Sequence, residues 1–111
     1  MVIGYDAFDA VEMRVGTVVA AEPFPAARKP AYKLTIDFGE PIGRRRSSAQ
    51  ITSLYSVGEL LGTRIVAVVN FAPKNIAGFS SEVLVLGVSD RQGRIVLLRP
   101  DHPVDDGARV F

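Results

Sequence analysis

Residues 44–69, RRRSSAQITSLYSVGELLGTRIVAVV, decide the fold because they place one short helix between two strands of different character. The polar run 44–51 predicts a strand. Ser56, followed three residues later by Glu59, matches a capping box and predicts the start of a helix. Residues 65–69 are apolar and mostly β-branched, which favours a strand buried on both faces. We therefore predict a strand, a short helix and a strand, in this order.

Outward from this stretch, the chain predicts further short strands. Residues 11–21 and 32–38 alternate between apolar and polar positions, and residues 83–88 and 95–98 form two more β-type runs. Short strands with one helix after the third are typical of the OB-fold, and an SH3-like barrel is the alternative. We predict an all-β, five-stranded OB-fold Greek-key barrel with one short helix after strand 3, and we expect residues 1–111 to form a single domain.

The composition limits the classes of function. The chain has 111 residues, of which 48% are hydrophobic and 23% charged, with a net charge of +1 and no cysteine. It can form neither disulfides nor thiolate metal sites. Its apolar runs reach about five residues, against the roughly 20 that a membrane helix needs. Residues 1–6 also lack the pattern of a secretory signal. We expect a cytoplasmic protein without membrane insertion.

A long connection, residues 70–82, joins two of the apolar runs. A connection of this length in a small domain is usually functional. It contains one lysine, two asparagines, two serines and one glutamate, but no pair that resembles a nucleophile and its base. The single histidine, His102, is interpreted as a solvated loop residue. These observations predict a binding surface rather than an enzyme, with no cofactor and no metal.

The basic residues are unevenly distributed along the chain. Between positions 28 and 46 there are six of them against two acidic residues, so this segment has a net charge of +4 and the rest −3. In an OB barrel such a segment covers the usual ligand face. Two interpretations stay open: an anionic ligand, either RNA phosphates or an acidic peptide, or a solvated strand edge that discourages pairing. The six residues are Arg28, Lys29, Lys33, Arg44, Arg45 and Arg46.

Aromatic side chains could supply the apolar part of a binding site. Tyr32 and Phe38 alternate in step with the apolar positions of their strand, which favours the core. Phe71 and Phe79 flank the long connection, and packing explains each of them more readily than base stacking. We expect Phe24, between two prolines, to be exposed on the binding side.

Eight blocks of the sequence, spread over residues 8–111, match one family when taken together. They are RVGTV at 14–18, AEPFP at 21–25, ARKPAYKL at 27–34, IDFG at 36–39, SSAQIT at 47–52, VAVVNF at 66–71, PK at 73–74 and SEVLVLG at 81–87. The chain resembles the CsaA family of bacterial export-related chaperones. That family lies within the wider set of OB-fold tRNA-binding domains appended to methionyl- and phenylalanyl-tRNA synthetases.

The resemblance implies a homodimer that binds unfolded preprotein segments and is related to tRNA-binding proteins. In the tRNA-binding relatives, the long connection reads approximately Asn-Leu-x-Pro, Met-Arg-Gly and Ser-x-Gly-Met. Here Ile76-Ala77 replaces Met-Arg, and Val83-Leu84 replaces Gly-Met. These departures favour a dimeric, non-catalytic chaperone that binds unfolded preproteins or peptides for export. A tRNA-binding module acting as an RNA chaperone is the alternative.

The two functions predict overlapping sites, and the terminal segments predict dimerisation. Residues 2–5 and 108–111 are apolar where a monomer would expose them, and burial against a second copy would cover them. The predicted peptide-binding residues are Arg28, Lys29, Asn70, Phe71, Lys74, Phe79, Ser81 and Glu82. The predicted RNA-binding residues are Lys29, Lys33, Arg44, Arg45, Arg46, Asn70, Lys74 and Ser81.

Overall fold

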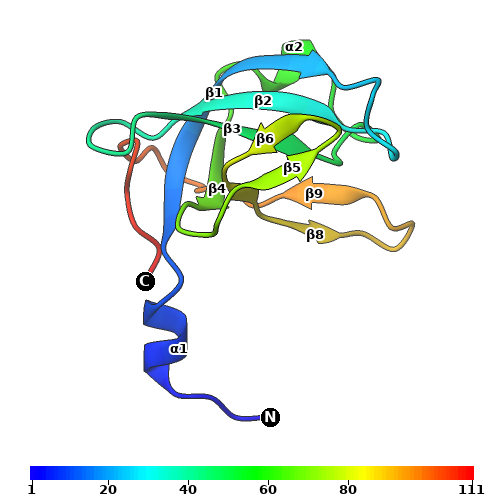
Figure 1. Cartoon of the computed structure of the whole chain (residues 1–111). Coiled ribbons are helices and arrows are strands. Elements are labelled where there is room, and N and C mark those ends of the chain that lie inside the picture. The colour runs from blue at the N-terminus through cyan, green and yellow to red at the C-terminus, as the bar shows by residue number, and fades with distance from the viewer.

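The computed structural model describes all 111 residues, which form short strands and two short helices (Figure 1). Five strands form one antiparallel sheet in the order β3-β2-β1-β4-β7, and this sheet curls into a nearly closed barrel. The prediction of an all-β, OB-type barrel with a helix after the third strand is confirmed. The elements are α1 Tyr5–Asp9, β1 Met13–Pro23, β2 Tyr32–Asp37, β3 Arg44–Ala49, α2 Val57–Leu60, β4 Arg64–Val68, β5 Lys74–Ile76, β6 Phe79–Ser81, β7 Leu84–Val85, β8 Gly87–Ser89 and β9 Ile95–Leu97.

The long strand β1 curls the sheet because its two halves pair with different strands. Its first half pairs with β4 and its second half with β2, and the register shifts between Val18 and Ala20. Such an irregularity bends a strand. Just before it, a Cβ atom at Gly16 would lie 2.6 Å from Ile36 and 2.7 Å from Phe38. Glycine at this position therefore lets the side chains of Ile36 and Phe38 pack directly on the backbone of β1.

The buried side chains of the barrel follow the alternation of apolar and polar residues in the sequence. Leu34, Ile36 and Phe38 are fully buried, and Tyr32 packs against the same cluster, as predicted. Ile65 of β4 belongs to the same cluster and is fully buried. Burying an apolar side chain of this size stabilises a fold by about 1.5–3 kcal/mol.

Helix α2 begins and ends where the sequence predicts. Ser56 Oγ accepts a hydrogen bond from Glu59 N–H at 3.3 Å, and Ser56 N–H donates to Glu59 Oε1 at 2.9 Å. The hydrogen bond from the Ser56 backbone holds the pKa of the Glu59 carboxyl below its ordinary value. Leu60 is buried in the core, whereas Leu61 is exposed, and Gly62 ends the helix with a φ of +81°.

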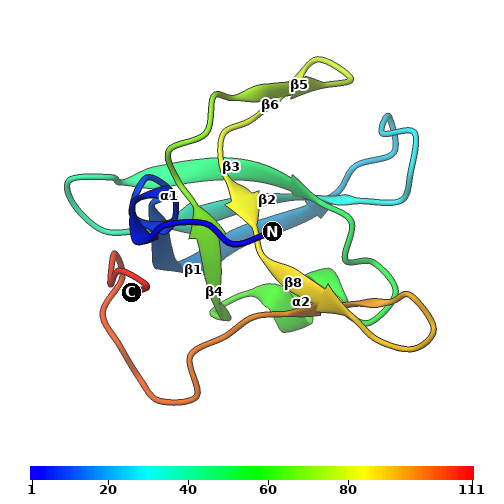
Figure 2. The ribbon, with the colours of Figure 1, turned by 90° about the horizontal axis from the view of Figure 1, so that it is seen from below.

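The segment after β4 differs from the prediction. The long connection contains a hairpin, β5–β6, that stands out from the barrel on the side of β3 (Figure 2). Its two-residue turn, Ala77-Gly78, has φ values of +48° and +83°, as a hairpin turn of this length requires. The predicted strand 83–88 is divided: β7 pairs with β4, and β8 pairs with β9. At the division, a Cβ atom on Gly87 would lie 2.7 Å from Ile95, so the close approach of β9 requires glycine.

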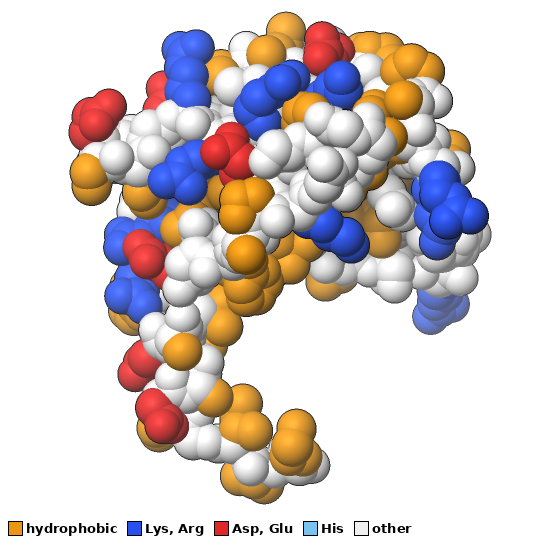
Figure 3. All heavy atoms as spheres, viewed as in Figure 1, with side chains coloured by type: hydrophobic (Ala, Val, Ile, Leu, Met, Phe, Trp, Pro, Cys, Tyr) orange, Lys and Arg blue, Asp and Glu red, His pale blue; other side chains and the backbone are white.

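The N-terminal arm, residues 1–10, was not predicted to be helical, and it projects from the barrel (Figures 1 and 3). It contains α1, none of whose residues is buried. Asn70 holds its base, because Asn70 Nδ2 donates to Ala10 O at 2.8 Å and Asn70 Oδ1 accepts from Glu12 N–H at 2.9 Å. Neither helix of the chain is long and apolar enough to cross a membrane.

Candidate functional site

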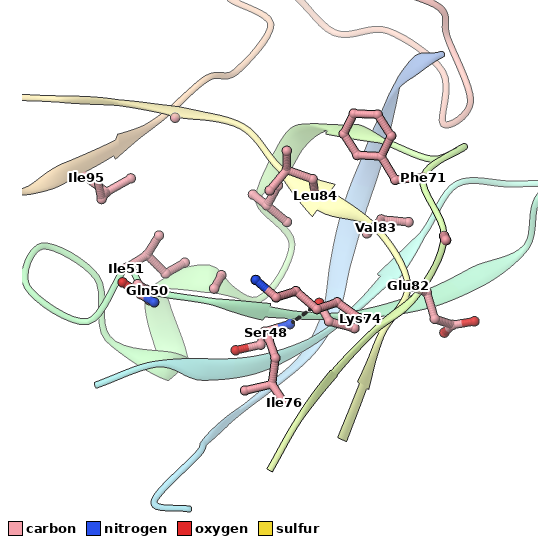
Figure 4. Close-up of a pocket in the computed structure, with 15 residues that line it drawn as sticks. Ser48, Gln50, Ile51, Phe71, Lys74, Ile76, Glu82, Val83, Leu84 and Ile95 are labelled. Carbon is pink, nitrogen blue, oxygen red and sulfur yellow. Dashed lines mark hydrogen bonds between the residues drawn. The ribbon is translucent and has the colours of Figure 1, made fainter. Parts of the chain in front are cut away.

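A groove of about 480 Å³ opens between the end of β3 and the segment that runs from β5 to β8 (Figure 4). We call it the β3–β7 groove. Its lining comes from residues 48–51, from the connection between Phe71 and Ile76, from residues 81–87 and from Ile95 of β9. Nine of the fifteen lining residues are hydrophobic, so the groove suits an apolar ligand with a few polar groups.

The groove has a buried apolar floor and an exposed apolar rim. Ala49, Ile51 and Val83 lie at the floor and belong to the main core cluster. Phe71 and Leu84 lie at the rim, and each is 50% exposed. Both side chains are labelled in Figure 4. Large apolar side chains that remain this exposed beside a cavity are typical of an interaction site.

The groove is lined by one positive and one negative side chain, Lys74 and Glu82. Lys74 is exposed, and it takes part in none of the four ion pairs of the chain. Figure 4 shows its side chain extending across the groove. The carboxylate of Glu82, in contrast, is engaged, because Glu82 Oε1 accepts a hydrogen bond from Arg46 N–H at 2.9 Å. An acidic group in the groove would therefore meet an unpaired ammonium.

Two of the predicted polar anchors attach the connection to the barrel. Ser81 Oγ accepts a hydrogen bond from Ser48 N–H at 3.0 Å, and Glu82 bonds Arg46 through both its side chain and its backbone. Asn70 lies outside the lining of the groove, at the base of the N-terminal arm. All three side chains hold local structure in place, and their part in binding a ligand stays a prediction.

The prediction that Phe24 is exposed is wrong. Phe24 is 4% exposed and Phe79 is 7% exposed, and their rings pack edge to face with 5.4 Å between the centroids. Lys33 Nζ lies 4.8 Å from the Phe24 centroid, and the Arg46 guanidinium lies 4.6 Å from that of Phe79. The hairpin β5–β6 folds onto the 22–31 loop, and two cations cover the buried rings. Phe79 is thereby a packing residue of this second cluster.

The structure does not bring all predicted basic residues to one place. Arg28 lines a separate, shallower hollow of about 380 Å³ beside the 23–32 loop, and Lys29 is exposed on the same loop. Arg44, Arg45 and Arg46 lie along β3, where Arg44 forms an ion pair with Asp37 at 3.7 Å. Arg46 forms another with Glu22 at 3.4 Å. Among the predicted basic residues, only Lys74 lines the β3–β7 groove.

Several residues of the groove were not predicted from the sequence. Gln50, Ile51, Leu84 and Ile95 were interpreted only as parts of strands or as apolar runs. One signal was present: Val83-Leu84 stands where tRNA-binding relatives have Gly-Met, and this position lies at the groove. Ile51 and Ile95 carry no local signal, because alternating apolar residues look the same in a core and beside a cavity. Gln50 is one polar residue at the end of a polar run and carries none either.

Comparison with solved structures extends over the whole chain. The crystal structure of chaperone CsaA from Bacillus anthracis superposes with a TM-score of 0.94 at 48% sequence identity, and the match covers 100% of both chains. The structure of the CsaA chaperone protein from Picrophilus torridus gives a TM-score of 0.93 at 47% identity and covers 99% of this chain and 100% of that one. Both agree with the blocks of sequence from which the resemblance was inferred.

The sequence comparisons point to the same family. The profile of the "Putative tRNA binding domain" matches residues 13–109. The methionine–tRNA ligase of Methanothrix thermoacetophila is 38% identical over 109 residues, and the match covers 98% of this chain but only 16% of that ligase. A MetRS-related protein from Pyrococcus horikoshii is 30% identical, with a TM-score of 0.88 and coverage of 100% of this chain and 99% of that one. The chain therefore belongs to the family of putative tRNA-binding domains and, within it, to the CsaA proteins.

Proposed function

We propose that this protein is a non-catalytic, homodimeric chaperone of the cytoplasm that binds unfolded preproteins or peptides for export. The observation that supports this most strongly is the β3–β7 groove, with its apolar floor and the half-exposed Phe71 and Leu84 at its rim. Unfolded polypeptides differ from folded ones in exposing apolar side chains, and such a groove can bury these side chains away from water. The 48% identity to the B. anthracis CsaA chaperone supports the same function.

The proposed site can be tested with one pair of matched variants. Leu84 at the rim and Leu61 beside α2 are 50% and 55% exposed, so a charge at either position leaves the core intact. Leu84→Asp should weaken the binding of a labelled unfolded polypeptide by about tenfold, since it places a charge in apolar surroundings. Leu61→Asp should leave binding unchanged. Equal affinities of the two variants, measured by fluorescence anisotropy, would exclude the groove as the site.

The proposed dimer rests on the N-terminal arm. Met1, Val2, Ile3 and Tyr5 are largely or fully exposed, and Phe111 at the other end of the chain is fully exposed. Hydrophobic side chains gather along the projecting arm (Figure 3). A second copy related by two-fold symmetry would cover both ends at once. Light scattering should give twice the subunit mass for the wild type and one subunit mass for Val2→Asp/Ile3→Asp, and a monomeric wild type would exclude this assembly.

A tRNA-binding function is the second candidate, and the arginines of β3, of which Arg44 and Arg46 are exposed, favour it together with the family profile. Replacing Arg44, Arg45 and Arg46 with glutamine should weaken RNA binding and flatten its dependence on salt. Each phosphate contact that is lost lowers the slope of log affinity against log salt by about 0.7–0.9. An unchanged slope would show that these arginines contact no phosphate. RNA binding that salt does not weaken would argue against a phosphate-driven site altogether.

A further inference from the structure

One wall of the β3–β7 groove is an unpaired strand edge. In β3, the even-numbered residues face away from β2: Arg46 exchanges hydrogen bonds with Glu82, and Ser48 N–H donates to Ser81 Oγ. Gln50 is the next residue in this direction, and neither its backbone nor its side chain has a hydrogen-bond partner in the chain. The 81–82 segment thus closes the edge of β3 as far as Ser48 and leaves Gln50 open.

The opposite wall is a second strand edge. Val68 is paired with Leu84, and Leu86 N–H donates to Val66 O at 2.9 Å. In an antiparallel ladder, alternate residues point their N–H and C=O groups toward the neighbouring strand. Val85 therefore points its backbone groups away from β4, and β7 is the last strand of the sheet on this side. The barrel is incomplete between Gln50 and Val85, and the groove occupies this gap.

We propose that the β3–β7 groove binds an extended polypeptide segment as an additional β-strand, which pairs with the backbone of Gln50 and places an acidic group beside Lys74. This inference rests on the proposed chaperone function and specifies its ligand. Main-chain hydrogen bonds give such a complex affinity for many sequences, since every peptide carries them. Because successive side chains of a strand point to opposite faces, only every second residue needs to be apolar to cover the floor.

The groups that face the groove favour a polypeptide over RNA and over a second copy of this chain. Free backbone N–H and C=O groups on an apolar floor match a peptide backbone, whereas RNA phosphates would meet Lys74 as the single lysine of the lining. The extended start of the N-terminal arm, residues 1–4, is apolar but has no acidic side chain for Lys74. Its first acidic residue, Asp6, lies within α1. An unfolded segment can bring both features in extended form.

Backbone pairing can be separated from side-chain contact with methylated peptides. The probe is a labelled, capped hexapeptide of alternating valine and threonine with one aspartate, and two further versions carry N-methyl groups on alternate peptide nitrogens, in either register. We expect at least one methylated register to bind about tenfold more weakly than the parent, because its N–H donors face the open edge. We also expect the parent peptide to slow hydrogen exchange at the Gln50 amide by at least about tenfold. If both registers bind like the parent, or if Gln50 is not protected, the proposal is wrong.

The pairing of an acidic peptide side chain with Lys74 can be tested separately from backbone pairing. Lys74→Gln should weaken binding of the aspartate peptide by about two- to fivefold, as expected for a partly exposed ion pair, and should not affect a peptide with asparagine in its place. Arg91→Gln removes an exposed positive charge outside the groove and should affect neither peptide. Equal losses for the aspartate and asparagine peptides would exclude an acidic group beside Lys74.

The failure of this proposal is distinguishable from the failure of the proposed function. If Leu84→Asp binds unfolded polypeptide normally, the chaperone site itself lies elsewhere. If Leu84→Asp weakens binding while Gln50 stays unprotected, the groove binds clients by side chains alone. If Gln50 is already protected without peptide, and Val2→Asp/Ile3→Asp removes the protection, the occupant is a second copy of this chain. Protection by tRNA in place of peptide would identify a nucleic-acid groove.

Discussion

The two sides of this barrel contain similar apolar residues and use them differently. On the closed side, where β1, β2 and β4 pair on both edges and β3 pairs with β2 over its whole length, Leu34, Ile36 and Phe38 are fully buried. On the open side, from the end of β4 to β9, Phe71 and Leu84 stay half exposed. The difference lies in strand pairing, because an apolar side chain is covered only where the neighbouring strand continues. Where pairing stops, the same residue types form a candidate binding surface.

The ladders differ in the same way. β2 pairs with β3 over six residues, whereas β7 pairs with β4 over two and β5 with β6 over three. On the open side, the side chains of Ser81 and Glu82 replace part of the ladder. Short ladders and few buried contacts lower the free energy of local opening. We therefore expect the open side to exchange its amide hydrogens before the closed side does.

The largest loss of stability should come from a substitution in the core of the closed side. Phe38→Ala removes a fully buried ring from the main core cluster, and we expect it to lower the free energy of unfolding by about 3–5 kcal/mol. Equilibrium unfolding in urea measures this directly. Leu61→Ala, at an exposed position beside α2, should change stability by less than about 0.5 kcal/mol. A loss below about 1 kcal/mol for Phe38→Ala would contradict the assignment of Phe38 to the core.

A smaller and more local effect is expected on the open side. Phe79 packs in a separate cluster with Phe24 and Ala31, so Phe79→Ala should cost about 3 kcal/mol, at the lower end for a buried aromatic. Hydrogen exchange should accelerate in β5 and β6 and stay unchanged in β2. Phe71→Ala is the matched control: at the exposed rim it should weaken client binding with little loss of stability. If Phe79→Ala weakens binding without destabilising the hairpin, Phe79 belongs to the site instead.

The open side can also be stabilised without touching the groove. Ala77 has a φ of +48° in the β5–β6 turn, a conformation that asparagine tolerates better than alanine. Ala77→Asn creates the favoured Asn-Gly hairpin turn and should raise stability by about 0.5–1 kcal/mol. Ala77→Val, with a branched side chain, should lower it. The melting temperatures of the two variants and of the wild type measure these effects. A valine variant that is more stable than the wild type would contradict the positive φ of Ala77.

The smallest effect concerns pH and the helix of the closed side. The hydrogen bond from the Ser56 backbone lowers the pKa of Glu59 in the folded protein. A carboxyl with a lowered pKa stabilises the fold above its unfolded pKa, and this contribution is lost as the pH falls through the folded value. Between about pH 5 and pH 3, where Glu titrates, the wild type should therefore lose more stability than Glu59→Gln. Glu40→Gln, at a side chain without a hydrogen bond or ion pair, should lose as much stability as the wild type over this pH range. If the free energy of unfolding of the wild type and of Glu59→Gln changes with pH in parallel, Glu59 does not contribute to the pH dependence of stability.

Local patterns were enough to predict the closed side. The alternation in residues 32–38 and the capping box of Ser56 and Glu59 depend on neighbours within a few positions, and both are confirmed. The blocks that resemble the CsaA family were equally readable in the sequence. The prediction for Phe24 was wrong because its burial depends on Phe79, a residue from a distant part of the chain. Flanking prolines indicate a loop, but they do not show what folds over it.

The sequence by itself determined the strands β1 to β4 and β9, the position of α2 and the family of the chain, because each of these is recorded in the order of residue types. Only the tertiary structure decided where the barrel stays open. Gln50 and Val85 carry the same backbone groups as every other residue, and whether those groups are paired depends on which strands become neighbours. The division of residues 83–88 between two sheets leaves this gap. A strand edge becomes a candidate site only when the fold provides no partner for it.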